Sequence, residues 1–287
     1  MNADEERAAK YRDDPRSTEE LIELVLSKDA DADNDEYWHP IWILQHRLPI
    51  IFDRVTQLSK APDEKSRETA ATLLGQNGVR NKFGPRGCLD QLLLMVPGER
   101  SVKVLSSIAF ACGHLHEPGC IKALLHLKQH RDADVRYAIV HSLSGHEDNH
   151  AIQALIELSS DDDQDVRNWA TFGIGSQIDT DTAEIRNALL ARLQEADPEI
   201  RGEALVGLVR RNDKRVIAPL LRELELVSPD VLREWALMSD AIESVMRAAT
   251  QTRSELWLPI LERAKALGIA ETIQIQAAID GCKPRQE

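Results

Sequence analysis

Three stretches of the chain repeat one pattern: residues 132–145 (DADVRYAIVHSLSG), 163–176 (DQDVRNWATFGIGS) and 197–210 (DPEIRGEALVGLVR). Each begins with an aspartate, which suits a helix N-cap because its carboxylate can accept hydrogen bonds from the unpaired N–H groups of the first turn. The first apolar residue stands three residues later, and further apolar residues follow it at i+4 and i+8, on one face of a helix. The residue at i+7 is small in all three, which permits close approach of a neighbouring helix. The pattern therefore predicts three equivalent, closely packed helices.

The same spacing continues towards the N-terminus. Asp63 opens one match and Glu99 opens another, whose predicted buried stripe is Val102, Ser106 and Phe110. Successive first apolar positions are separated by 36, 33, 31, 34 and 31 residues, and second apolar segments follow them. Two helices of this size cannot form a core alone, so the repeats must stack. The predicted fold class is all-α, an α-α superhelix (a helical-repeat solenoid) of about five to six helical hairpins with capping helices.

The repeated run also resembles a known family. Asp-x-Asp/Glu-Val/Ile-Arg, followed by alanine and a small-Leu/Ile-Gly ending, is similar to the HEAT-like repeat of phycobilin lyase subunits. The resemblance covers residues 37 to 230 and weakens at Val231, where Leu232 takes the place of the arginine. It implies an α-α superhelix and a protein-binding role, and it makes the match at Val231 a predicted cap.

Charge divides the chain into three predicted parts. Residues 1–36 form an acidic N-terminal arm with 13 acidic and 5 basic residues, in a chain of net charge −13. Ser17 and Glu20 have the spacing of a capping box, which predicts one short amphipathic helix within the arm. Residues 37–229 are the HEAT-like repeats, and 230–287 are C-terminal capping helices. The excess of lysine and arginine that binds nucleic acid phosphates is absent, so nucleic acid is not an expected partner.

Targeting signals are also lacking. The first ten residues contain no apolar segment, and no run approaches 18 apolar residues, so we predict a cytoplasmic protein without a membrane partner. The four cysteines show no CxxC spacing and are expected to be buried free thiols.

Seven of the nine histidines fall between His114 and His150. His126 and His130 have i, i+4 spacing, as do His146 and His150, and two histidines at this spacing on a helix can bind a metal ion. Two His-Glu dipeptides, at 116–117 and 146–147, resemble the iron-binding mark of deoxyhypusine hydroxylase. In that enzyme the dipeptide lies inside the first helix, whereas here both fall in predicted turns. We therefore expect solvated turn histidines with no metal and no cofactor, and a metal-dependent enzyme using histidines 114–150 is an alternative.

The sequence contains no serine or cysteine nucleophile with a general base at a recognisable spacing, and no glycine-rich phosphate-binding loop. No catalytic residue is therefore predicted. The predicted function is a non-catalytic scaffold or adaptor that binds a partner protein. The second helices are expected to line the concave side, where the candidate partner-binding residues are Lys122, His126, Gln153, Glu157, Arg186 and Arg222. A lyase or chaperone subunit related to phycobilin lyases is the alternative that the resemblance implies.

Aromatic residues supply further candidates. Trp169 and Phe172 lie at the edge of their apolar stripe, where they either fill a gap between first helices or anchor a partner. The cluster at 37–42 (YWHPIW) either seals the end of the core or offers a binding patch. Pro49 is expected to break or kink its helix near Leu48.

One position of the repeat is cationic in five copies: Arg67, Lys103, Arg136, Arg167 and Arg201. Each lies beside the acidic turn of the preceding repeat. We therefore expect a ladder of hydrogen-bonded ion pairs that fixes the stacking angle, with direct ligand contact as the alternative.

Overall fold

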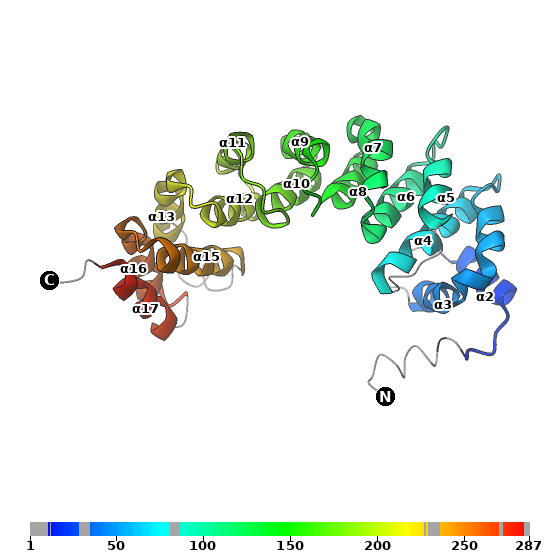
Figure 1. The fold of residues 1–287 in the computed structure, drawn as a ribbon, viewed down its shortest axis with the longest axis horizontal. Coiled ribbons are helices and arrows are strands. Elements are labelled where there is room, and N and C mark those ends of the chain that lie inside the picture. Colours follow the sequence, from blue (N-terminus) through cyan, green and yellow to red (C-terminus); the bar gives the residue numbers. More distant parts are fainter. Residues whose placement is uncertain are drawn as a thin grey trace. The chain divides into compact units, whose positions relative to one another are not determined.

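A computed structural model describes residues 11, 13–28, 35–80, 87–226, 228, 236–269 and 272–283. Every regular element among these residues is a helix, as predicted, and no strand occurs in them. The chain divides into two compact units, residues 1–143 and 144–287. Each unit is a stack of helical hairpins (Figure 1).

Unit 1 begins with α2 (Thr18–Leu26), which packs on the long helix α3 (Asp35–Leu58). Its repeats are built from first helices that pack directly on one another and from shorter second helices. The first helices are α4 (Glu64–Arg80), α6 (Val102–Leu115) and α8 (Ala133–Leu143). The second helices are α5 (Gly87–Met95) and α7 (Pro118–Leu124), which continues as the 3-10 helix η1 (Leu125–Gln129).

Unit 2 continues the pattern. Its first helices are α10 (Gln164–Ser176) and α12 (Pro198–Arg210). Its second helices are α9 (Asn149–Leu158), α11 (Ala183–Arg192) and α13 (Ile217–Leu226). The 3-10 helix η2 (Lys214–Val216) precedes α13. The C-terminal helices α15 (Ala236–Thr252), η3 (Glu255–Trp257), α16 (Leu258–Leu267) and α17 (Thr272–Cys282) pack on α12 and α13. The predicted match at Val231 lies outside the described residues.

The predicted caps are confirmed. Asp163 Oδ1 accepts hydrogen bonds from the backbone N–H groups of Asp165 and Val166, and Asp197 caps α12 in the same way. Ser17 and Glu20 form the predicted capping box at α2. Because each cap satisfies N–H groups that the helix itself cannot, these short polar residues define where the helices begin.

Small residues bring the first helices into backbone contact. A Cβ atom on Gly207 of α12 would lie 2.6 Å from the Cα of Gly175 of α10, and one on Gly75 of α4 would lie 2.3 Å from the Cα of Ala111 of α6. In unit 2, the second helices α9 and α11 stand further apart than α10 and α12 (Figure 1). The more closely spaced layer of a curved stack lies on its inside. The first helices therefore form the inner layer of unit 2, whereas we expected the second helices there.

Pro49 was expected to break or kink its helix; the break is wrong, and the kink stays a prediction. Helix α3 runs without interruption from Asp35 to Leu58. Leu48, Ile51 and Val55, around the proline, are buried. A proline inside a helix costs about 3 kcal/mol, and burial of several large apolar side chains at about 2 kcal/mol each offsets that cost.

The predicted repeat frame of α6 is wrong by two residues. Its N-cap is Ser101, whose Oγ accepts from the N–H of Val104. The buried stripe is Val104, Ile108 and Cys112, whereas the predicted stripe of Val102, Ser106 and Phe110 is partly exposed. Glu99 has the spacing of a cap, but its carboxylate accepts instead from the N–H groups of Arg100 and Ser101. The three side chains expected in the core are therefore half-buried and lie outside the buried stripe of α6.

The ion-pair ladder is confirmed for three arginines. Arg67 pairs with Glu99 at 2.7 Å, Arg167 with Glu195 at 3.4 Å, and Arg201 with Glu223 at 2.8 Å. Each guanidinium also donates to backbone carbonyls five and six residues earlier, in the turn before its helix. Each carboxylate stands later in the sequence than its arginine, either in the turn before the next first helix (Glu99, Glu195) or in the second helix of the same hairpin (Glu223), not in the preceding acidic turn. Arg136 also donates to the carbonyl of His130, at 2.8 Å, and Lys103 is displaced by the shifted frame.

Candidate functional site

A groove of about 720 Å³ opens on the first-helix side of unit 1, where α3, α4, α6 and α8 meet. We call it the first-helix groove. Its size is typical of cavities that hold a small molecule or a few side chains of a partner. The lining includes four aromatic rings, three hydroxyl side chains and several charged groups: Tyr37, Trp38, Phe110, Tyr137; Thr72, Ser106, Ser107; Lys65, Glu68, Lys103, His114 and Asp134.

The rings of the groove support one another. Tyr37 and Trp38 pack edge to face with centroids 5.1 Å apart, and Phe110 and Tyr137 do so at 6.1 Å. Lys65 Nζ lies 4.9 Å from the centroid of the Tyr37 ring. Tyr37 is fully buried and Trp38 is half-buried. One member of the predicted aromatic cluster thus belongs to the core, and its neighbour borders the groove.

Two polar atoms at the groove lack a partner. Among the described residues, the hydroxyl of Tyr37 and Oγ of Ser106 are buried and accept or donate no hydrogen bond within 3.5 Å. Burial raises the pKa of Tyr37 to about 12, and the side chain of Thr72 offsets part of that rise, so the hydroxyl stays protonated. A buried polar group without a partner costs about 1–3 kcal/mol.

The histidine cluster is dispersed over unit 1 and unit 2. Loss of solvation lowers the pKa of His114. The pKa of His141 is also lowered, mainly by loss of solvation and further by the charge of the nearby His114. Within the described ranges, no three His, Cys, Asp or Glu side chains are grouped as a metal site requires. The expectation of solvated turn histidines is wrong for His146, whose side chain is buried in its turn.

The sequence-predicted binding residues are divided between the two units. Lys122 and His126 are exposed on α7 and η1 of unit 1, while Gln153 and Glu157 lie on α9, and Arg222 lies on α13, all exposed in unit 2. None of these five borders the first-helix groove. Their role in binding stays a prediction.

Trp169 and Phe172 pack edge to face on α10 with ring centroids 5.7 Å apart. Trp169 is 37% exposed and Phe172 is half-buried. The pair therefore presents part of its aromatic surface to solvent on the first-helix side of unit 2. Its role as an anchor for a partner also stays a prediction.

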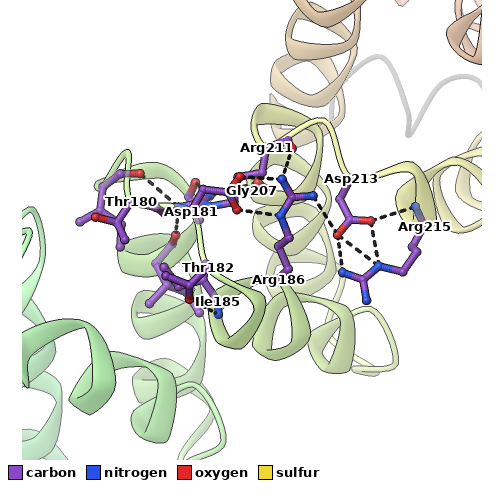
Figure 2. A network of polar contacts seen from close by, with 12 residues as sticks. Thr180, Asp181, Thr182, Ile185, Arg186, Gly207, Arg211, Asp213 and Arg215 are labelled. Carbon is purple, nitrogen blue, oxygen red and sulfur yellow. Dashed lines mark hydrogen bonds and ion pairs between the residues drawn. The ribbon is translucent and has the colours of Figure 1, made fainter. Parts of the chain in front are cut away.

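Arg186 is engaged within the protein, as Figure 2 shows. Its guanidinium lies 2.6 Å from Asp181 and 3.4 Å from Asp213, and it donates to the carbonyl of Arg211 at 2.6 Å. Asp213, nearly fully buried, also pairs with Arg215, whose hydrogen bonds hold the pKa of Asp213 at about 2. Arg186 thus joins α11 to the turn before α13.

Arg211 lies at the centre of this network (Figure 2). Its side chain donates to the carbonyls of Ile174, Gly175, Gly207 and Thr180, at distances from 2.8 to 3.2 Å. Burial lowers the pKa of this guanidinium below its ordinary value. The carbonyls at the end of α10 are thus paired with one buried cation. We infer a structural role for Arg211 as a clamp between α10 and α12.

Apart from Tyr37 and Trp38, sequence reasoning did not identify the residues of the first-helix groove as candidates. Ser106 and Phe110 were assigned to the core because Glu99 was taken as the start of the repeat. The signal that could have found them is Ser101, since serine is a far better N-cap than glutamate. With the repeat starting at Ser101, Ser106 and Phe110 fall outside the predicted buried stripe of α6.

The profile of the HEAT-repeat family matches residues 89–175 and 157–241, together more than half of the chain. The chain belongs to the HEAT-repeat family. No helix in the described ranges has the length and apolar character needed to cross a membrane.

Individual HEAT-repeat proteins resemble this chain over different lengths. Protein YibA of Escherichia coli strain K12 is 32% identical over 132 residues, which are 46% of this chain and 42% of YibA, so the match spans less than half of that relative. The X-ray structure of E. coli YibA superposes with a TM-score of 0.69 at 23% identity, covering 98% of this chain and 97% of that one. A chain from the structure of Kap95p bound to RanGDP gives a TM-score of 0.66 at 15% identity, covering 98% of this chain and 41% of that one. These structural likenesses show the fold alone.

Proposed function

We propose that this HEAT-repeat protein is a non-catalytic interaction scaffold, and that its first-helix groove binds a segment of a partner protein. The observation that carries the proposal is the combination, in one groove, of half-exposed aromatic rings with hydroxyl and charged side chains. Aromatic anchors supply much of the free energy of protein interfaces. Hydroxyl groups can pair with the backbone of a bound segment, which fixes its position.

The groove is suited to binding because its walls are held in place. Phe110 and Tyr137 pack on each other, and the ring of Tyr137 lies 4.8 Å from that of His141. Their helices, α6 and α8, pack directly together. Side chains that are already ordered lose little conformational entropy when a partner binds, which favours affinity.

Known HEAT solenoids favour the same class of function. Kap95p, whose structure shares this fold, is a protein that binds RanGDP. The likeness supports protein binding as the class of function and leaves the partner to be found. A cytoplasmic location, and the absence of nucleic acid and membrane partners, are parts of the proposal that rest on composition.

A lyase or chaperone subunit is the second candidate. It rests on the similarity of the repeat to phycobilin lyase subunits, and the same repeat serves many scaffolds. The position of the gene beside phycobiliprotein genes would favour it, and a non-photosynthetic host would remove it. A metal-dependent enzyme built on the histidines is a weaker candidate, which metal analysis of the purified protein would test.

The test of the scaffold is capture of partners from the lysate of the protein's own host, identified by mass spectrometry. Ser107→Trp fills the first-helix groove without removing core packing. Glu157→Lys with Arg222→Glu changes the charge of the second helices and serves as the matched control. We expect a dominant partner that wild type and the control retain and Ser107→Trp loses.

The opposite pattern, with loss in the control variant alone, would move the binding site to the second helices. A partner retained by every variant would place it on neither face. Failure of all three proteins to capture any partner would count against a scaffold.

A further inference from the structure

A second cleft, of about 870 Å³, lies between the second helices of unit 1. We call it the second-helix cleft. Its floor is apolar and consists of Leu93 and Val96 at the end of α5, Leu105 of α6, and Leu127 of η1. Three of these four side chains are nearly buried, so the floor is part of the packed body of the unit. It is separate from the first-helix groove, which no residue of the cleft borders.

The rim of the cleft is cationic. Arg100 and Arg131 are both exposed, and His126 and His130 lie beside them. Among the described ion pairs, neither arginine has a carboxylate partner. In a protein of net charge −13, an apolar floor with two unpaired guanidinium groups is a local reversal of charge. Such a patch attracts anionic groups.

The one carboxylate that lines the cleft cannot neutralise this rim. Glu99 pairs with Arg67 at 2.7 Å and accepts from the backbone N–H groups of Arg100 and Ser101 at 2.9 Å. Its side chain is only 8% exposed. The negative charge of Glu99 is therefore directed into the stack of first helices and away from the rim.

We infer that the second-helix cleft binds an acidic amphipathic peptide segment of a partner protein. Apolar side chains of the segment would cover the floor, and its carboxylates would meet Arg100 and Arg131. Arginine suits this role because its planar fork can donate two parallel hydrogen bonds to a carboxylate. His126, one of the sequence-predicted binding residues, lies at the same rim, and Lys122 precedes it by four residues on α7.

A peptide fits the cleft better than a nucleic acid does. Nucleic acid binding needs many neutralised phosphates and, for single strands, aromatic rings on which bases stack. The cleft offers two arginines, and no Phe, Tyr or Trp is among its lining residues. The remaining charge of the protein is strongly negative and repels a long polyanion. The inference does not depend on the first-helix groove being a binding site.

The experiment uses the full-length protein and a phage-displayed library of random peptides, selected on wild type. Recovered peptides are measured by fluorescence anisotropy against wild type, Arg100→Glu with Arg131→Glu, and the control pair Lys60→Glu with Arg247→Glu. All four substituted positions are exposed, and the control makes the same change in net charge outside the cleft. Circular dichroism checks that each variant stays folded.

We expect peptides that combine apolar residues with Asp or Glu, and about tenfold weaker binding to the double variant in the cleft. The control pair should bind as wild type does, and added salt should weaken binding. Recovery of no peptide, recovery of basic or uncharged sequences, or equal loss in the control would overturn the inference. So would an oligothymidine that competes with the peptide at similar concentration, since the rim would then select phosphate.

Discussion

Arg67 and Glu99 join two consecutive repeats of unit 1, with Arg67 Nε 2.7 Å from Glu99 Oε2 across 32 residues of sequence. The same guanidinium donates to the carbonyls of Ala61 and Pro62, and the same carboxylate caps the backbone of the next turn. One ion pair thus satisfies the turns at both ends of a helical hairpin. It sets the register between the hairpins more than it adds to their stability.

The Arg67–Glu99 pair should make the protein sensitive to acid. Burial tends to raise the pKa of Glu99, but hydrogen bonds from Arg67 and the backbone outweigh it, and the pKa falls below its ordinary value of 4.5. A carboxylate with a lowered pKa stabilises the fold above pH 4.5 and loses that contribution as the pH falls through its folded value. We expect Glu99→Gln to lower the free energy of unfolding by about 1–2 kcal/mol at pH 7, with a smaller difference at pH 3.

Urea denaturation across this pH range measures the effect. Glu23→Gln, at an exposed site on α2, is the control. If the free energies of unfolding of wild type and Glu99→Gln differ by the same amount at pH 7 and at pH 3, the ionised carboxylate contributes nothing to stability.

The repeat and most of its caps could be predicted because both are local properties of the sequence. An aspartate, an apolar residue three positions later and a small residue further on are enough to place α8, α10 and α12. The start of α6 could not be chosen this way, because Glu99 and Ser101 both stand before it. The choice depends on Arg67, which holds Glu99 in another role from a distant hairpin.

The candidate site was less predictable than the fold. The first-helix groove combines side chains of α3, α4, α6 and α8, and its depth depends on how those helices cross. The role of Arg211 was also hidden, since its acceptors are backbone carbonyls of other helices. Neither feature leaves a spacing in the sequence that a pattern can detect.

The close approach of α10 and α12 predicts the effect of adding one methyl group. A Cβ on Gly207 would lie 2.6 Å from the Cα of Gly175, and backbone cannot move aside as a flexible side chain can. We expect Gly207→Ala to lower the free energy of unfolding by about 1–3 kcal/mol.

Gly281, in α17, is the matched control because nothing lies within 4 Å of its Cβ position. There the change to alanine should stabilise the protein by about 0.5–1 kcal/mol. Thermal unfolding of the two variants measures the difference. Equal effects at the two sites would contradict the proposed contact between α10 and α12.

The clamp formed by Arg211 should be among the costliest contacts to remove. Arg211→Met keeps much of the side-chain volume and leaves the carbonyls at the end of α10 without donors. We expect a loss of about 3 kcal/mol or more in the free energy of unfolding. Arg210→Met removes a guanidinium that donates to the single carbonyl of Ser176 at 2.6 Å and lies 3.4 Å from Asp179, and it should cost about 1 kcal/mol, less than Arg211→Met.

Hydrogen exchange distinguishes this clamp from a general loss of stability. The amides of α11 and the turn before it should exchange faster in Arg211→Met, while those of α16 and α17 should change less. Uniform acceleration throughout unit 2 would argue that Arg211 does not act locally.

Glu203 on α12 should give a pH dependence of opposite sign to that of Glu99. Burial raises its pKa to about 7, and the negative charges of Glu199 and Asp240 add to the effect. One of its carboxylate oxygens is buried without a hydrogen-bond partner among the described residues. A carboxyl group with a raised pKa stabilises the fold below its unfolded value near 4.5 and loses that contribution as the pH rises through 7.

We therefore expect Glu203→Gln to leave stability nearly unchanged at pH 4 and to raise it by about 2 kcal/mol at pH 8. Asp240→Asn should shift the midpoint of the wild-type pH profile downwards, because one of the charges that oppose ionisation of Glu203 is gone. Urea denaturation from pH 4 to pH 8 measures both effects. If the free energy of unfolding of the wild type stays constant between pH 5 and pH 8, and that of Glu203→Gln follows the same course, Glu203 ionises as it does in the unfolded chain. The carboxylate would then lie in water, not among the first helices of unit 2.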